Sequence, residues 1–389
     1  MATAECRRPP PQLLLVLLLL AAAADSRRSV NWFNSGGGWT VGTDGLNFSS
    51  WLAAHGPGSP SPAITGTMPC CGCWGVNAST GIFNSSPRCA RANAADGPFA
   101  QAHRADLAAA QAAGLTIEPT GSLPAPFLLN ESWLLPGSLD SAVAMVESAG
   151  WTGFGIDNED WIGKGSPTSP RLPEQFRRFL GNLSKVMGAA KKTVVIDVCS
   201  TWHGDIGGPE HLADYAKAAP GIRFLDMGEY YSDDTNSFYT KLPALKQMLP
   251  LPAIAPAVGL TAAAGHKNAS CGGWPQCANV TDKACGCIDY KWNHTAFSAF
   301  VREVERLGIS EIDVWRQDMT PPPGTTASIP DWLLSELAGF LKRGEELEEG
   351  DEDRVLSVLN PGYGGRASPS KGRRARERAM APGSADAAP

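Results

Sequence analysis

The sequence alternates short apolar segments with longer segments of helical periodicity, and this alternation limits the possible folds more than any other feature. Apolar runs of strand length lie at 193–198 and 311–315, whereas 173–190 carries its apolar residues at helical spacing. Strands that are apolar on both faces and are joined through helices form a parallel sheet covered by helices. We count about eight strand–helix units, the number that closes a (β/α)8 TIM barrel. The predicted fold is therefore α/β, with such a barrel as its architecture.

The predicted elements alternate along the chain. The predicted strands are 29–34, 63–68, 115–119, the run leading to Asp157, 193–198, 222–227, 253–260 and 311–315. The predicted helices are 48–54, 99–113, 139–149, 173–190, 209–219, 238–248, 294–307 and 332–341. A doubly wound open sheet is the alternative, but no Gly-x-Gly-x-x-Gly turn follows an early strand.

The two ends of the chain are predicted to lie outside the barrel, which we assign to residues 25–343. Residues 1–24 resemble a signal peptide, since two arginines precede the apolar run 13–20 and alanines follow it. This run is too short for an ordinary membrane span. Residues 344–389 have an acidic stretch, then a basic one, among small residues and proline, so we expect a disordered tail.

Many Asn-x-Ser/Thr sequons support entry into the secretory pathway. They lie at Asn47, Asn77, Asn84, Asn130, Asn182, Asn268, Asn279 and Asn293. Each alone is a weak match, but their number beside a signal peptide indicates a glycoprotein. We therefore expect a protein that is secreted or lumenal, in an extracellular, lysosomal or vacuolar location.

The cysteines fall into two groups that we expect to staple loops. Cys6 would leave with the signal peptide, and most of the others are Cys70, Cys71, Cys73, Cys89, Cys271, Cys277, Cys285 and Cys287. In an oxidising compartment each group would form local disulfides, giving a barrel with disulfide-stapled loops. Zinc binding is the alternative, but the paired Cys-x-x-Cys knuckles of a zinc site are missing.

Composition and motifs also narrow the partners. The formal net charge of -6 argues against nonspecific nucleic-acid binding, which needs a basic surface. No nucleotide, haem or flavin motif is present, so we expect neither a cofactor nor a metal.

Acidic side chains cluster after a glycine-spaced apolar run that begins at Gly150. The cluster contains Asp157, Asn158 and Glu159. On a strand, Asp157 and Glu159 project to the same face, with Cα atoms about 6.6 Å apart. Two carboxylates at this spacing are costly to bury unless the fold uses or pairs them, which indicates a functional site. The alternative is a solvated strand end or a helix cap.

Other polar and aromatic residues stand at the carboxyl ends of predicted strands, where barrel sites are built. They are Glu118, Asp197, Glu229, Tyr230, Tyr231 and Trp315. Trp315 is favoured as a flat platform for a ligand, because a tryptophan at the end of a barrel strand has few apolar neighbours to bury it. The tyrosines contact substrate or pack in the core, and Glu118 lines the site or caps the strand before Pro119.

The acidic strand resembles the fourth strand of glycoside hydrolase family 18, the chitinase-like barrels. That family carries D-x-x-D-x-D-x-E there, and its last two acids align with Asp157 and Glu159. Thr152 and Gly155 stand where the family has its first two acids. Two further segments, 227–231 and 312–319, loosely resemble the family's sixth and eighth strands.

The resemblance implies a hydrolase of N-acetylhexosamine-containing glycans that retains configuration by substrate assistance. Glu159 would protonate the glycosidic oxygen, while Asp157 would orient the substrate's N-acetyl group. The implied carbohydrate partner would contact Asn158, Glu229, Tyr230, Tyr231 and Trp315, with Glu118 at the same mouth.

Two other functions stay open. Asn158 and Glu159 also match the Asn-Glu pair of many retaining barrel glycosidases, in which case Glu229 would have to be the nucleophile. Alternatively the barrel binds carbohydrate as an inactive, lectin-like protein. The presence of Thr152 and Gly155 in place of the family's first two acids favours this alternative.

Overall fold

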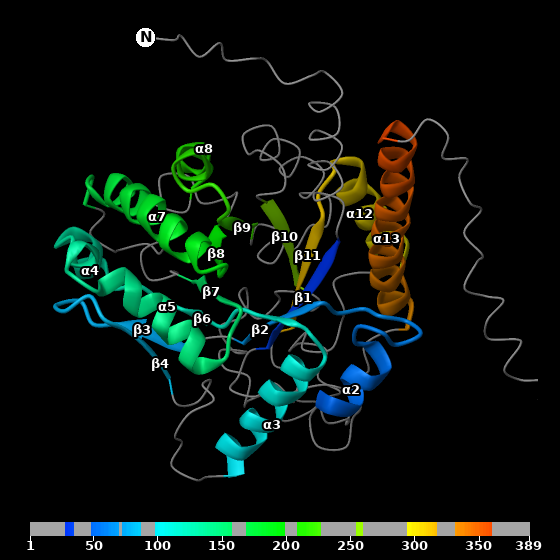
Figure 1. The fold of residues 1–389 in the computed structure, drawn as a ribbon, viewed down its shortest axis with the longest axis horizontal. Coiled ribbons are helices and arrows are strands. Elements are labelled where there is room, and N and C mark those ends of the chain that lie inside the picture. Colours follow the sequence, from blue (N-terminus) through cyan, green and yellow to red (C-terminus); the bar gives the residue numbers. More distant parts are fainter. Residues whose placement is uncertain are drawn as a thin grey trace, which may run out of the picture. The chain divides into compact units, whose positions relative to one another are not determined.

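The computed structural model describes residues 28–34, 48–69, 72–86, 98–157, 169–198, 208–226, 254–259, 294–316 and 331–359. Residues 25–345 form one compact unit. Within this unit the strands lie inside and helices surround them (Figure 1). The protein is therefore an α/β protein, as the alternation in the sequence predicts.

A nine-stranded parallel sheet is the centre of the unit, in the order β5-β2-β1-β11-β10-β9-β8-β7-β6. Its strands are β1 (Ser29–Asn34), β2 (Gly66–Pro69), β5 (Thr116–Ile117), β6 (Thr120–Gly121), β7 (Gly153–Ile156), β8 (Thr193–Val198), β9 (Arg223–Asp226), β10 (Ile254–Gly259) and β11 (Glu311–Arg316). The helices are α2 (Phe48–His55), α3 (Pro98–Ala112), α4 (Ala125–Leu129), α5 (Ser138–Ala149), α7 (Leu172–Ala189), α8 (Pro209–Ala218), α12 (His294–Arg306) and α13 (Asp331–Leu359), with the short 3-10 helix η1 (Ser132–Leu134).

The two ends of this strand order lie on one segment of the chain. Strands β5 and β6 are separated by Glu118 and Pro119 alone. On one side the amide of Glu118 donates to the carbonyl of Thr67 on β2, at 3.0 Å. On the other side the amide of Gly155 on β7 donates to the carbonyl of Pro119, also at 3.0 Å. Segment 116–121 is therefore hydrogen-bonded to strands from both ends of the order.

The two faces of the sheet differ in chemistry. Phe154 and Ile156 of β7 and Ile196 of β8 belong to the main apolar cluster, together with helix residues such as Phe179. Because successive residues of a strand point to opposite faces, the alternate positions face the other way. Those positions carry glycines and acids as well as apolar residues, and they form the inner face on which the site is built.

Glycines end two helices as predicted. Gly114 follows α3 with φ +70°, and Gly150 is the C-cap of α5 with φ +75°. Only glycine adopts this left-handed conformation at little cost, so it is favoured where a helix turns into a strand. The amide of Gly150 donates to the carbonyl of Glu147 at 3.1 Å, which satisfies one of the last carbonyls of the helix.

Several short elements were not predicted. The antiparallel hairpin β3 (Trp74–Val76) and β4 (Phe83–Ser85) follows the first cysteines, and the short helices α4 and η1 occupy a segment expected to be a loop. Three-residue strands are too short to show a period in the sequence, and a five-residue helix too short to show an apolar stripe.

The last helix is longer than predicted. We expected it to end near Leu341 and the disordered tail to begin at residue 344, but α13 continues to Leu359. The added stretch is rich in Glu and Leu, whose high helix propensity outweighs the cost of Gly344 and Gly350. The rest of the tail, the signal peptide, the predicted helix 238–248 and most of the cysteines lie outside the described residues.

Candidate active site

Asp157 extends strand β7 by one residue into the candidate site. Its amide donates to the carbonyl of Gly121 at 2.8 Å, which continues the pairing of β7 with β6. The Asp157 side chain is half-buried, whereas residues 153–156 before it are buried. Asp157 thus lies at the end of a buried strand, in a position that is partly exposed.

The glycines of β7 are required by close neighbours on the inner face. A Cβ on Gly153 would lie 2.1 Å from Oγ1 and 2.3 Å from the carbonyl oxygen of Thr193. A Cβ on Gly155 would lie 2.7 Å from Cγ2 of Thr120 and 3.2 Å from Cγ1 of Val195. The position at which the family pattern has an acid is therefore already filled by neighbouring side chains.

Trp74 of the hairpin holds the same part of β7 through its indole. Its Nε1 lies 3.0 Å from the carbonyl oxygen of Gly155 and 3.1 Å from that of Pro119, so one N–H is shared between them. The indole also packs edge-on against Phe154, with ring centroids 4.9 Å apart. A loop that the sequence left unassigned thus fixes the strand that carries Asp157.

A second acid, Asp197 of β8, lies beside Asp157. The registered pairs of β7 and β8 end at Ile156 and Ile196, so the next residues along both strands are the two aspartates. Neighbouring strands are about 4.8 Å apart, and residues in register point to the same face. Asp197 is 3% exposed. The sequence indicates that Asp197 ends a strand, but the register that brings it to Asp157 is not visible there.

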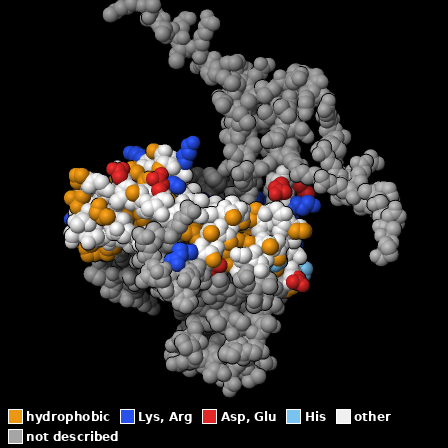
Figure 2. Space-filling view, turned by 60° about the horizontal axis from the view of Figure 1, so that its bottom comes forward, with side chains coloured by type: hydrophobic (Ala, Val, Ile, Leu, Met, Phe, Trp, Pro, Cys, Tyr) orange, Lys and Arg blue, Asp and Glu red, His pale blue; other side chains and the backbone are white. Residues whose placement is uncertain are grey.

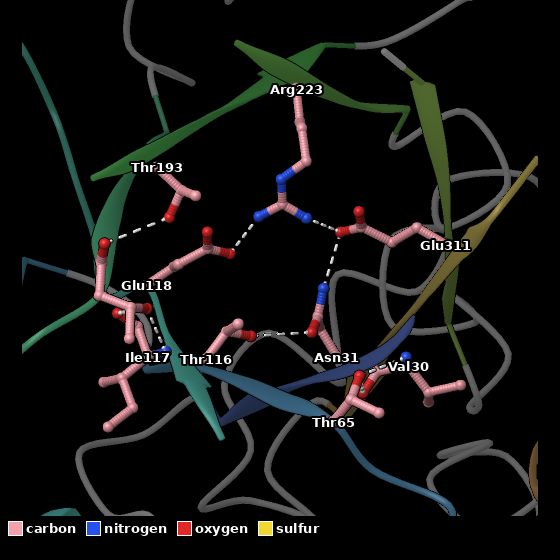
Figure 3. A network of polar contacts seen from close by, with 10 residues as sticks. Val30, Asn31, Thr65, Thr116, Ile117, Glu118, Thr193, Arg223 and Glu311 are labelled. Atoms are coloured by element: carbon pink, nitrogen blue, oxygen red, sulfur yellow. Dashed lines mark hydrogen bonds and ion pairs between the residues drawn. The ribbon is translucent and has the colours of Figure 1, made fainter. Parts of the chain in front are cut away.

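A buried ion-pair network occupies the inner face at the other end of the strands. Arg223, at the start of β9, pairs through one guanidinium nitrogen with Glu118 and through another with Glu311 (Figure 3). Asn31 of β1 donates to Oε1 of Glu311 at 2.7 Å, and Thr116 lies 3.4 Å from Oδ1 of Asn31. Figure 3 shows these side chains converging from several strands.

The acids of this network favour the charged form of Arg223. Burial alone would lower the pKa of Arg223, but the negative charges around it, chiefly Glu118 and Glu311, outweigh burial and raise that pKa. Nearby Asp313 of β11 is fully buried. Burial, helped by the charge of Glu311, raises the pKa of Asp313 well above its usual value. This favours the protonated form of Asp313.

Glu118 belongs to this network. Gly155 pairs with Thr120, so Glu118 is level with Gly153, four positions before the level of Asp157. Four positions correspond to about 13 Å along a strand. The Glu118 side chain is 1% exposed and has Arg223 as its partner. The structure thus gives Glu118 an ion-pair partner that lies away from Asp157.

Most of the other predicted site residues lie outside the described residues. Asn158, Glu159, Glu229, Tyr230 and Tyr231 are outside the described residues, although β7 and β9 lead directly toward them. The backbone of Trp315 lies on β11, between Phe33 of β1 and Gly259 of β10. This places Trp315 near the carboxyl end of β11, as predicted.

Three other kinds of site would each need a different feature: a cluster of metal ligands, a long apolar helix or a basic surface. Among them, no group of three or more His, Cys, Asp or Glu side chains is arranged to hold a metal ion. None of the helices in the described ranges has both the length and the apolar character of a membrane span. On the face shown in Figure 2, the charged side chains of the described residues are scattered rather than gathered into a basic stripe.

These features define an α/β protein of chitinase-like fold. It is similar to catalytic domain 2 of the Group II chitinase of Ostrinia furnacalis, with a TM-score of 0.54 and 12% identity over 82% of this chain and 97% of the other. A class V chitinase from Pseudomonas fluorescens Pf-5 gives a TM-score of 0.50 with 14% identity, over 81% of this chain and 99% of the other. The Group IV chitinase of Ostrinia furnacalis gives a TM-score of 0.51 with 10% identity, over 82% of this chain and 99% of the other.

The comparisons confirm the distant chitinase-like resemblance predicted from the acidic strand. At these identities the likeness is one of fold. No protein-family model matches the sequence. No curated protein matches it either.

Proposed function

We propose that this protein is a glycoside hydrolase that cleaves N-acetylhexosamine-containing glycans, as chitinases do. The observation that carries the proposal is the position of Asp157. This acid directly follows β7, a buried, glycine-spaced strand, in a chitinase-like fold. The family pattern that the sequence resembles has its acids at this place.

The proposed scaffold is a closed (β/α)8 barrel. Segment 116–121 is hydrogen-bonded to β2 on one side and to β7 on the other, which supports closure of the sheet on itself. Counted in this way, β5 and β6 are two parts of one barrel strand. Asp157 and Trp315 would then lie near the same carboxyl-end rim, where barrel enzymes build their sites.

The proposed mechanism needs one acid and one orienting carboxylate. The carboxylic acid of Glu159 gives its proton to the glycosidic oxygen as the bond to the anomeric carbon breaks. The carbonyl oxygen of the substrate's own N-acetyl group attacks that carbon. Asp157 accepts a hydrogen bond from the acetamido N–H and stabilises the positive charge that develops there. Water, deprotonated by Glu159, then opens the cyclic intermediate, so the product retains its configuration.

The same proposal assigns the other contacts to the substrate. Trp315 would provide a flat apolar surface for a sugar ring, and Tyr230 and Tyr231 would bind polar groups of the sugar. Asn158 and Glu229 would complete the polar wall of the site. These assignments rest on the chain positions of the residues at strand ends.

We also propose that the protein acts in the secretory pathway or outside the cell, with disulfides in its two cysteine-rich loops. The exposed side chains of Asn77, Asn84 and Asn130 are compatible with glycosylation at three of the sequons.

The stereochemistry of the product tests the mechanism. Protein secreted by a eukaryotic host is incubated with N-acetylglucosamine oligomers, and the anomeric protons of the first product are followed by NMR. Early accumulation of the β-anomer from β-linked substrate supports substrate-assisted retention. Early accumulation of the α-anomer contradicts it. Binding of the oligomers without any turnover would favour the lectin-like alternative.

A further inference from the structure

We propose that the β3–β4 hairpin binds one N-acetylglucosamine unit, namely the first sugar of an N-linked glycan carried by Asn84. The inference rests on the proposed secretory location and is independent of the glycosidase chemistry. It gives the sugar a structural role. The bound sugar holds together the hairpin whose Trp74 indole lies 3.1 Å from the carbonyl oxygen of Pro119 and 3.0 Å from that of Gly155.

A cavity of about 380 Å³ lies on this hairpin. Its lining includes the complete sequon Asn84-Ser85-Ser86 and a second sequon asparagine, Asn77. Binding sites for small molecules span about 300–1,000 Å³, so this volume suits a single sugar ring with its acetamido group rather than a longer glycan. The residue that would carry the glycan thus stands in the wall of a cavity that fits the first sugar.

Asn84 lies opposite a glycine in the hairpin. Asn84 is exposed, and its partner across the antiparallel pair is Gly75. Side chains directly opposite each other share a face, with Cβ atoms about 4.5–5.5 Å apart. A Cβ on Gly75 would meet nothing within 4 Å. The space that a side chain at position 75 would fill is therefore free beside Asn84, and we place the sugar there.

The side-chain amide of Asn84 is held by its own strand. Its Nδ2 donates to the carbonyl oxygen of Ile82 at 3.3 Å. An asparagine that carries a sugar keeps one N–H on Nδ2, so this hydrogen bond remains possible after glycosylation. The bond then fixes the direction in which the sugar leaves the side chain.

Asn77 provides a second oriented polar group in the lining of the cavity. Its Oδ1 accepts hydrogen bonds from the amides of Ser79 and Thr80, at 2.9 and 3.0 Å. Its Nδ2 has no hydrogen-bond partner among the described residues. Such an N–H suits the carbonyl oxygen of the acetamido group, and the hydroxyl of Ser85 suits a sugar hydroxyl. Asn77 keeps one N–H for this contact even if its own sequon carries a glycan.

The hairpin is an element that an added ligand would stabilise. It has three paired residues on each strand, and an isolated two-stranded hairpin is marginally stable at best. One backbone bond to the sheet is donated by the amide of Cys73 to the carbonyl of Thr120, at 3.0 Å. A sugar that contacts Gly75 of β3 and is attached to Asn84 of β4 opposes separation of the two strands, because it binds only the paired form.

Hydrogen exchange of the hairpin tests the inference. The protein is secreted by a eukaryotic host, its glycans are trimmed enzymatically to one N-acetylglucosamine per site, and mass spectrometry gives the occupancy of each sequon. We expect a sugar on Asn84. We also expect the amides of residues 72–86 to exchange about 5-fold or more slowly in this protein than in Asn84→Gln treated in the same way.

Two controls isolate the effect of this sugar. Asn130→Gln removes a sugar from an exposed sequon that does not line the cavity, so it should leave exchange in residues 72–86 unchanged. Wild type and Asn84→Gln are also made with glycosylation blocked. These two glycan-free proteins should exchange alike in the hairpin, which excludes an effect of the substitution itself.

A further variant fills the cavity and leaves the sequon intact. Gly75→Ile places a side chain directly opposite Asn84, and isoleucine suits a strand. Protection is measured as the ratio of exchange rates between the glycan-free and the trimmed protein. We expect this ratio to fall from about 5-fold in wild type to less than about 2-fold in Gly75→Ile, because the sugar is displaced.

The outcomes separate this inference from the proposed function. A sugar on Asn84 that leaves hairpin exchange unchanged overturns the inference, as does protection that survives Gly75→Ile. An unoccupied Asn84 in a protein glycosylated at other sequons overturns it too. Protection by added N-acetylglucosamine oligomers but not by the attached sugar would make the cavity a substrate site instead. If no sequon is occupied, the proposed secretory location fails and this inference with it, whereas turnover measured on the same samples tests the glycosidase separately.

Discussion

Trp74 and Gly155 are joined by a hydrogen bond of 3.0 Å from the indole Nε1 to the glycine carbonyl oxygen. The tryptophan comes from the β3–β4 hairpin, and the glycine lies two residues before Asp157. A Cβ on Gly121 would lie 2.4 Å from the carbonyl oxygen of Trp74, so the hairpin also lies directly against β6. The hairpin therefore supports the pair of strands from which Asp157 emerges.

Trp74→Phe should destabilise the protein through this contact. The substitution leaves the Gly155 and Pro119 carbonyls without their shared donor, at a cost of about 1–3 kcal/mol in the free energy of unfolding. Urea unfolding measures the change. Trp51→Phe is the matched control, because Trp51 is 2% exposed and its Nε1 has no hydrogen-bond partner among the described residues. Equal losses in the two variants would show that packing, and not the hydrogen bond, is what Trp74 contributes.

Arg223→Met should be strongly destabilising. It leaves Glu118 and Glu311 buried without their cation, which costs about 3–5 kcal/mol in the free energy of unfolding. The control is Arg177→Met, which breaks an exposed pair with Glu174 on α7 and should cost at most about 1 kcal/mol. The measurement is again urea unfolding. If the Arg223 variant is no less stable than the Arg177 variant, the ion pairs of Arg223 with Glu118 and Glu311 do not stabilise the protein as predicted.

Gly155→Ala should destabilise the protein because its Cβ meets Thr120. Forcing one methyl group into this space costs about 1–3 kcal/mol. Adding Thr120→Ser removes the nearest atom, Cγ2, and should recover most of the loss. Gly188→Ala on α7 is the control, since a Cβ there meets nothing within 4 Å. Thermal unfolding of the set decides the matter: a Gly155→Ala protein as stable as wild type would mean that the space beside β7 is open.

Asp106 on α3 should make stability depend on pH. Burial raises the pKa of Asp106 from 3.8 to about 7, and its side chain is 4% exposed. The folded state therefore holds this proton more tightly than the unfolded state, so stability falls as pH rises from about 4 to about 7. Asp106→Asn cannot lose a proton. Relative to wild type it should gain on the order of 3 kcal/mol between pH 5 and pH 8.

Unfolding free energies of both proteins at pH 5 and pH 8 test this prediction. Other groups titrate in both proteins, so the difference between wild type and variant isolates Asp106. A difference that stays constant with pH would show that Asp106 is ionised in the folded protein.

The sequence predicted the elements whose apolar pattern is complete. Residues 193–198 are apolar on both faces and long enough to stand out, and the structure places β8 there. The helix that ends at Gly150 was predicted because glycine marks the change of backbone conformation. The hairpin β3–β4 had neither length nor period, although its Trp74 is central to the packing around β7.

The sequence indicated single residues of the candidate site, but not which residues of different strands lie side by side. Asp157 stood out because acids follow a buried run. The relation of Asp157 to Asp197 depends on the register of two strands separated by helix α7, and that register is set by packing of the whole sheet. For the same reason the pairing of Glu118 with Arg223 could not be predicted, because Arg223 lies more than one hundred residues away in the sequence.

The central claim is that Glu159 is the general acid of a glycosidase, and one comparison tests it most directly. Wild type and Glu159→Gln are assayed on fluorogenic N-acetylglucosamine oligomers, and binding of the oligomers to both is measured by calorimetry. We predict turnover by the wild type, a loss of about 10²- to 10⁴-fold in kcat in the variant, and retained binding in both. Equal turnover by the two proteins, or binding without turnover by either, would contradict the claim.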